Sequence, residues 1–334
     1  MRAIVLDRPG PVDDGAAPLR LVDLPEPTPG PDEIVVRVTA CGVCRTDLQI
    51  VEGDIPSRRL PIVPGHQPVG RVTAVGDDVA GWAIGDRAGV GWLAGTCGAC
   101  GHCVAGRENL CEQATFTGWD RDGGFADSIA IRASAALRLP AAFDDLDAAP
   151  LLCGGVIGYR SLRVSGIAPG GRLGLYGFGA SALIAIQVAR HWGCEVHVAT
   201  RAPRERDRAL ALGAASVGGY DEMPPHPLDA AITFAPSGAV VVAALRAVDR
   251  GGTVAINAIH LDRIPSFDYD LLWWERTIRS VANSTRRDAV ELLDLAASIP
   301  IRTTVTRFPL ASAGEALAAL KAGRIEGAAV LVVD

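Results

Sequence analysis

Residues 170–193 read GGRLGLYGFGASALIAIQVARHWG, and this stretch decides the fold of one half of the chain. Its apolar start predicts a strand that ends near Gly177, and its apolar end predicts a helix through about His191. Between them, Gly177 and Gly179 match the first two positions of G-x-G-x-x-G/A, and Ala182 takes the third. Glycines there let the backbone approach a pyrophosphate, which the helix N-terminus stabilises. Alone, this motif is a weak indication of nucleotide binding.

The segments that follow strengthen the indication. Further strands are expected at residues 194–200, 228–234 and 251–257, and further helices at 203–213 and 238–248. Strands and helices that alternate in this way predict a doubly wound parallel sheet of the α/β class.

The residues after the second expected strand bear on the cofactor. In such sheets an Asp or Glu usually follows that strand and binds the ribose hydroxyls of NAD. In this chain the position is Thr200, followed by Arg201 and Arg204. A neutral hydroxyl beside guanidinium groups suits a 2′-phosphate, because arginine offers paired donors. The sequence therefore favours NADP and leaves NAD open. The alternative is a solvated helix start, although cations are disfavoured at that end of a helix.

Length and composition exclude several classes of protein. A chain of 334 residues exceeds the usual size of one domain, so two domains are expected. The formal net charge of −6 argues against nucleic-acid and anionic-membrane partners. No apolar run is long enough to span a membrane, and the N-terminus lacks the pattern of a secretory signal. We expect a cytoplasmic protein, in which clustered cysteines bind metal rather than form disulfides.

Residues 97–111, CGACGHCVAGRENLC, carry the strongest local signal. Four cysteines, spaced C-x2-C-x2-C-x7-C, can wrap one loop around a structural zinc ion as a closed set of thiolates. An iron–sulfur cluster also takes four cysteines, but the chain offers no electron-transfer context for it. The expected structural ligands are Cys97, Cys100, Cys103 and Cys111.

A second metal site is suggested by three of the remaining groups. A catalytic zinc takes three protein ligands and keeps one position open. Cys44, His66 and Cys153 would supply such a set, but their spacing alone is weak evidence.

Several motifs, taken in order, resemble a known family. CGVCRTD at 41–47, GHQPVG at 65–70, GDRAGVGW at 85–92, the four-cysteine segment and LLCGGVIGYRSL at 151–162 resemble the zinc-dependent alcohol dehydrogenases of the medium-chain dehydrogenase/reductase superfamily. The resemblance covers essentially the whole chain. It implies a Rossmann cofactor domain at 154–281, and a mostly β, GroES-like catalytic domain at 1–153 and 282–334.

The resemblance also implies roles for individual residues. It makes Cys44, His66 and Cys153 ligands of a catalytic zinc, so that two Zn²⁺ ions are expected per chain. Thr46 would take the proton of the alcohol, and Asp47 would orient His66. The remaining implied roles are a pyrophosphate contact for Arg45 and a place beside the substrate channel for Trp92, Trp119 and, less securely, Ile55 and Ile259.

The chain departs from the family pattern at three positions. Gln67 replaces the usual Glu behind the zinc, and Ala328 replaces an Arg that often contacts the pyrophosphate. Gln49 replaces a histidine that ends the proton relay in many members, and a glutamine cannot act as a base near neutral pH.

The expected function is therefore that of an alcohol dehydrogenase or aldehyde reductase acting on a primary aliphatic or aromatic alcohol or its aldehyde. Two alternatives stay open: reduction of a conjugated C=C or C=N bond on the same scaffold, and a non-catalytic protein that binds the cofactor. Family members pair across a two-fold axis at the segment corresponding to residues 266–283, so a homodimer or homotetramer is expected.

Overall fold

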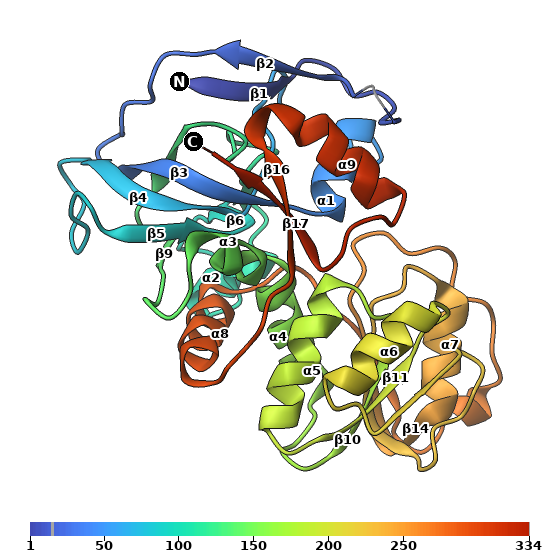
Figure 1. The fold of residues 1–334 in the computed structure, drawn as a ribbon. Helices are drawn as coiled ribbons and strands as arrows, with labels where there is room; N and C mark the ends of the chain where they lie inside the picture. Colours follow the sequence, from blue (N-terminus) through green and yellow to red (C-terminus); the bar gives the residue numbers. More distant parts are fainter. Residues whose placement is uncertain (15–16, 334) are drawn as a thin grey trace. The chain divides into compact units, whose positions relative to one another are not determined.

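A computed structural model describes residues 1–14 and 17–333, which divide into two compact units, each with its own hydrophobic core (Figure 1). One unit comprises Met1–Cys153 and Thr285–Asp334, and the other comprises Gly154–Ser284. The second crossing between the units thus falls after Ser284, whereas the sequence placed it after residue 281.

The unit formed by Gly154–Ser284 is built on a parallel sheet. Within the described residues, six strands lie in the order β12-β11-β10-β13-β14-β15, and every neighbouring pair is parallel. This arrangement confirms the expected doubly wound sheet. The strands are β10 (Arg172–Tyr176), β11 (Glu195–Ala199), β12 (Ser216–Gly218), β13 (Leu228–Thr233), β14 (Val248–Ile256) and β15 (Thr277–Ser280). The helices are α4 (Gly154–Ser165), α5 (Ala180–His191), α6 (Pro203–Ala211), α7 (Gly238–Ala247) and the short η3 (Tyr269–Leu271).

The turn between β10 and α5 requires its first glycine. Gly177 has φ of +92°, and a Cβ atom there would lie 2.9 Å from the backbone nitrogen of Ala235. A side chain is therefore excluded both by conformation and by space. Gly179 precedes α5 in an extended conformation, and no atom lies within 4 Å of the place its Cβ would take.

The other unit is built on a mixed, mainly antiparallel sheet. Among the residues described, seven strands take part: β16-β17-β3-β4-β5-β9 in order, with β8 pairing with β3. Its strands, with those of two small sheets, are β1 (Arg2–Leu6), β2 (Leu19–Asp23), β3 (Glu33–Val43), β4 (Pro68–Val75), β5 (Arg87–Val90), β6 (Leu93–Gly95), β7 (Thr115–Phe116), β8 (Ser128–Arg132), β9 (Ala136–Arg138), β16 (Val305–Pro309) and β17 (Ala328–Val332). Its helices are α1 (Arg45–Glu52), α2 (Gly101–Val104), α3 (Asp145–Ala148), α8 (Arg286–Ser298), α9 (Ala313–Lys321), η1 (Glu108–Leu110), η2 (Ala149–Leu152) and η4 (Leu310–Ser312).

The junction of β3 and α1 positions the first metal-ligand candidate. Cys44 is the N-cap of α1, and its sulfur accepts a hydrogen bond from the backbone N–H of Thr46 at 3.3 Å. The carboxylate of Asp47 in turn accepts from the backbone N–H of Cys44 at 2.8 Å, which completes a capping box. The cap thus fixes Cys44 and Asp47 together. Helix α9 lies beside α1 (Figure 1).

Candidate metal centres and cofactor site

Three segments of one unit bring Cys44, His66 and Cys153 together. Cys44 lies at the end of β3, His66 in the loop before β4, and Cys153 directly after η2. Nε2 of His66 lies 3.3 Å from the sulfur of Cys44 and 3.3 Å from the sulfur of Cys153. The three ligand atoms all lie within 4.8 Å of one another. Tetrahedral zinc holds such atoms about 3.5–3.8 Å apart, so the set fits a zinc ion with one open position.

Asp47 sets the orientation of the histidine. Its Oδ1 lies 2.9 Å from Nδ1 of His66, and both side chains are completely or almost completely buried. This contact turns Nε2 towards the two cysteines and leaves Nδ1 bound to a carboxylate, as is typical of metal-binding histidines. Asp47 thus contacts directly the histidine that it is expected to orient, and its role towards a bound zinc stays a prediction.

The electrostatics of this group suit a cation. The hydrogen bond from Cys153, with the charge of His66, holds the pKa of Cys44 well below its usual range, against the effect of burial. Burial alone would lower the pKa of His66, but the charges of Asp47 and Cys44 outweigh it and raise that pKa. The site therefore gathers negative charge from Cys44 and Asp47 in a buried place. A metal ion would neutralise this charge, and it binds cysteine as the thiolate.

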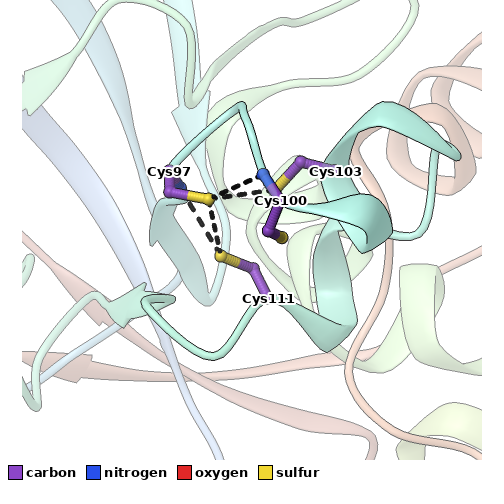
Figure 2. A group of neighbouring side chains, drawn as sticks. All are labelled: Cys97, Cys100, Cys103 and Cys111. Carbon is purple, nitrogen blue, oxygen red and sulfur yellow. Dashed lines mark hydrogen bonds between the residues drawn. The ribbon is translucent and has the colours of Figure 1, made fainter.

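The four cysteines of residues 97–111 form a second cluster, with sulfurs that converge (Figure 2). The sulfur of Cys97 lies 3.9 Å from that of Cys103 and 3.6 Å from that of Cys111. Backbone amides of Ala99 and Cys100 lower the pKa of Cys97 to about 6, which favours its thiolate. All four sulfurs, that of Cys100 included, lie within 4.8 Å of one another, which fits a closed structural zinc site.

An aromatic group contacts both metal-ligand clusters, because it packs with the four cysteines of residues 97–111 and also touches His66. Trp92 lies edge-on to the ring of His66, with centroids 5.0 Å apart, and stacks on Phe116 at 4.9 Å and on Trp119 at 5.9 Å. The guanidinium of Arg58 lies over Trp119, 4.0 Å from its centroid. Trp92 and Trp119, expected near the substrate, thus belong to one stack that touches His66. Phe116 and Arg58 complete it and were not identified from the sequence.

The other expected residues of this unit lie around α1. Thr46 is buried directly after Cys44, Arg45 is exposed at the start of the helix, and Gln49 is half-buried one turn later. Ile55 is half-buried after the end of α1. Ile259, which belongs to the other unit, is 67% exposed, so no side-chain packing supports a pocket role for it in that unit.

Gln67 is buried at 3% exposure beside the metal-ligand candidate His66. Its amide nitrogen has no hydrogen-bond partner in the described residues. A Cβ atom at Gly42 would lie only 2.7 Å from its Oε1, so Gly42 makes room for this side chain.

The nucleotide motif presents free backbone groups. Ala182 is fully buried in α5, where its small side chain allows close packing, and Gly177 and Gly179 form the turn before the helix. No side chain caps the N-terminus of α5, so its backbone N–H groups can bind a pyrophosphate. This arrangement fits a dinucleotide cofactor.

At the end of β11 the structure places Thr200 in the interior, at 2% exposure, and Arg201 and Arg204 at the surface. The hydroxyl of Thr200 donates a hydrogen bond to the carboxylate of Glu205, a residue that the sequence analysis did not single out. The guanidinium of Arg201 lies 5.9 Å from the ring centroid of Tyr220. Glu205 and Tyr220 thus belong to this site as well.

Two protein-family models match this chain, in separate stretches of the sequence. Residues 30–141 match the family described as alcohol dehydrogenase GroES-like domain, and residues 180–298 match the family described as zinc-binding dehydrogenase. A probable alcohol dehydrogenase, AdhA, of Mycobacterium tuberculosis is 51% identical over 339 residues, covering 100% of this chain and 97% of its own.

Solved structures of the same kind superpose over nearly the whole chain. A thermostable alcohol dehydrogenase of Pyrobaculum aerophilum with bound cobalt and zinc is 26% identical, with a TM-score of 0.88 and 99% of each chain covered. A zinc-binding dehydrogenase of Sinorhizobium meliloti bound to NADP is also 26% identical, with a TM-score of 0.86 and 99% and 98% covered. None of the helices in the described ranges has the length and apolar character needed to cross a membrane.

Proposed function

The chain belongs to the zinc-dependent alcohol dehydrogenases of the medium-chain dehydrogenase/reductase superfamily, and we propose that it interconverts a primary aliphatic or aromatic alcohol and its aldehyde with NADP. The observation that carries this proposal is the group of Cys44, His66 and Cys153, with Asp47 behind the histidine. Three ligands leave one coordination position for a substrate oxygen, whereas a closed site would not.

When bound, zinc supplies a Lewis acid for the substrate oxygen, and the nicotinamide supplies or accepts the hydride. The protein moves the proton. The hydroxyl of Thr46, buried beside Cys44, would take the proton of the alcohol. Gln49 cannot accept a proton near neutral pH, so in this chain the proton would pass to a water molecule instead. Trp92, in edge contact with His66 and stacked on Trp119, would give the substrate side of the metal site an apolar wall, which suits an aliphatic chain or an aromatic ring.

NADP is proposed because positive charge gathers after β11. Arg201 and Arg204 lie at the surface beside Thr200, and no Asp or Glu occupies position 200. Arginine pairs well with a phosphate group. Arg45, exposed at the start of α1, is proposed as a contact of the pyrophosphate.

The alternative functions have weaker support. A non-catalytic protein that only binds the cofactor does not require the residues of a catalytic metal site. This chain retains all of them: Cys44, His66, Cys153 and Thr46. Reduction of a conjugated C=C or C=N bond uses the same scaffold, and Gln67 in place of a carboxylate is the one feature that favours it.

Assembly and location are further proposals. The exposed edge of β15 suits pairing with a second copy of the chain, so we propose a homodimer or homotetramer. We also propose a cytoplasmic location, because no disulfide joins any of the eight cysteines, all of them described, and a reducing compartment keeps cysteines in that state.

The metal content of two variants tests the proposed function. The purified enzyme should contain two zinc ions per chain. Cys44→Ala should lose one ion and its turnover of alcohols, with little change in thermal stability. Cys100→Ala should lose the other ion and unfold at a lower temperature, because binding of a structural metal adds to the free energy of folding.

A panel of primary alcohols and aldehydes, assayed with NADP and NAD, completes the test. The proposal fails if the enzyme contains a single zinc ion, or if Cys44→Ala keeps wild-type turnover. Turnover of enones or imines without turnover of alcohols would favour the alternative reductase.

A further inference from the structure

The end of β11 carries a negative charge that the sequence pattern does not show. Thr200 is held rigidly: its backbone N–H donates to the carbonyl of Gly218 at 2.9 Å, and its own carbonyl accepts from Nε of Arg206 at 2.9 Å. Its hydroxyl donates to the carboxylate of Glu205, in the first turn of α6. The side chain of Thr200 is therefore fixed by its partner on the helix.

This hydrogen bond changes what Thr200 can offer a cofactor. A hydroxyl has one proton to donate and two lone pairs that accept. With its proton given to Glu205, Thr200 offers only its lone pairs to other groups, and Tyr220 is already one of its hydrogen-bond partners. A ribose 2′-hydroxyl can donate to it, but a 2′-phosphate, which at neutral pH carries close to two negative charges, cannot.

The charge of Glu205 also disfavours a 2′-phosphate. A carboxylate beside the hydroxyl repels a phosphate, while the guanidinium of Arg201 attracts it. The charges of Arg201 and Glu205 both act on the pKa of Tyr220, whose hydroxyl lies next to this site. Burial raises the pKa of Tyr220, the charge of Arg201 lowers it, and the charge of Glu205 raises it. Hydrogen bonds of Tyr220 with Thr200 and Arg201 also lower it. Arg201 and Glu205 thus compete at the place where the sequence analysis expects the 2′-phosphate.

We propose that Glu205 is a specificity-determining residue that weakens binding of 2′-phosphorylated cofactor relative to unphosphorylated cofactor. The inference rests on the proposed cofactor site at the end of β11. It assigns to this chain a balanced site, in which Arg201 and Arg204 favour NADP and Glu205 opposes them.

Two variants separate the charge of Glu205 from its hydrogen bond. Glu205→Gln removes the charge and keeps an acceptor for Thr200. Glu205→Ala removes both, and so returns the hydroxyl proton of Thr200 to the site. Asp207→Asn is the matched control, because it makes the same change of charge on the same helix at an exposed position.

The measurement is calorimetric titration with 2′,5′-ADP and with 5′-AMP, two fragments that bind without hydride transfer. At pH 7.5, Glu205→Gln should bind 2′,5′-ADP about tenfold more tightly than the wild type, and Glu205→Ala at least as tightly as Glu205→Gln. The affinity of both Glu205 variants for 5′-AMP should stay within about twofold of the wild-type value. Asp207→Asn should bind both fragments with the affinity of the wild type.

The inference is overturned if Glu205→Gln binds 2′,5′-ADP no more tightly than Asp207→Asn does, or if both fragments change equally. The proposed preference for NADP is judged separately, on the wild type alone. A wild type that binds 5′-AMP more tightly than 2′,5′-ADP contradicts that preference, while a tighter 2′,5′-ADP complex of Glu205→Gln would still support the role of Glu205.

Discussion

Gln49 shows how one residue can change a proton pathway without disturbing the fold. Its backbone carbonyl accepts hydrogen bonds from the N–H groups of Gly53 at 3.0 Å and Ile55 at 3.2 Å, while its half-buried side chain has no such structural bond among those described. The backbone at this position should therefore tolerate a different side chain. Thr46, which we propose as the proton acceptor, lies one turn earlier on α1.

We expect Gln49→His to raise the rate of alcohol oxidation near pH 7 by up to about tenfold, because an imidazole with a pKa of about 6.5 can accept the proton and release it to solvent. The pH profile should gain a titration near that value, whereas aldehyde reduction should change less. Turnover of the wild type, Gln49→His and the non-titrating control Gln49→Asn, each measured across pH with a solvent isotope effect, checks this. Identical profiles for all three would show that the proton leaves by another route.

Some of these residues were accessible from sequence and others were not. The four cysteines of 97–111 share one loop, so their spacing alone indicated a metal site. Cys44, His66 and Cys153 come from distant segments, and only the family resemblance joined them before the structure did. Glu205 could not be found in either way, because its role depends on a side-chain contact between the end of β11 and the first turn of α6.

At the scale of elements, an ion pair ties α1 to α9. Lys321 of α9 donates to the carboxylate of Glu52 at 2.7 Å and to the carbonyl of Val12 at 2.8 Å. Glu52 also accepts from the backbone N–H of Val12 at 3.2 Å. The helix that carries Thr46 and Gln49 is therefore anchored at its C-terminal end by α9.

Glu52→Gln should lower thermal stability in a pH-dependent way. Burial would raise the pKa of Glu52, but the hydrogen bonds from Lys321 and Val12 outweigh burial and lower it. A lowered folded-state pKa stabilises the protein above the unfolded value of about 4.3, and the stabilisation is lost as the pH falls through the folded value. Because the side chain of Lys321 is 41% exposed, we expect only about 0.5–1 kcal/mol at pH 7.

Melting curves between pH 3 and pH 8 check this, with Asp13→Asn as the control. Asp13 is 71% exposed and lies 3.7 Å from the same lysine, so its loss should matter little. At pH 7 the melting temperature of Glu52→Gln should be about 1–3 °C below that of the wild type. Near pH 3 the two melting temperatures should be the same. A difference that persists unchanged at pH 3 would mean that packing, not charge, makes the contact important.

Some helices and strands could be predicted from the sequence, and others could not. The parallel sheet followed from long alternating segments, but β12 (Ser216–Gly218) was missed because three residues show no periodicity. Residues 219–227, all described, connect β12 to β13 without the helix that alternation would suggest. In the other unit, β17 pairs with β3 from nearly 300 residues away, a partnership that no local pattern contains.

At the scale of the whole molecule, the proposed assembly depends on one sheet edge. Strand β15 pairs with β14 on one side, and no partner lies on its other side among the described residues. Its residues are largely exposed, and Trp273 and Trp274, just before it, are 51% and 49% exposed. An open parallel-sheet edge with exposed aromatic groups nearby favours pairing with a second copy, because such an edge presents unpaired N–H and C=O groups.

Ser280→Pro tests this assembly at a single backbone group. The N–H of Val281 donates to the carbonyl of Ile256, towards β14, so in an extended strand the N–H of the preceding Ser280 points to the open edge. Proline removes that donor and leaves the bonds to β14 in place, as edge strands tolerate. Light scattering of the eluting protein should give an oligomer for the wild type and for Ser280→Ala, and a shift towards the mass of one chain for Ser280→Pro, with unchanged circular dichroism. If Ser280→Pro keeps the wild-type mass, or if the wild type is itself a monomer, β15 does not form the interface.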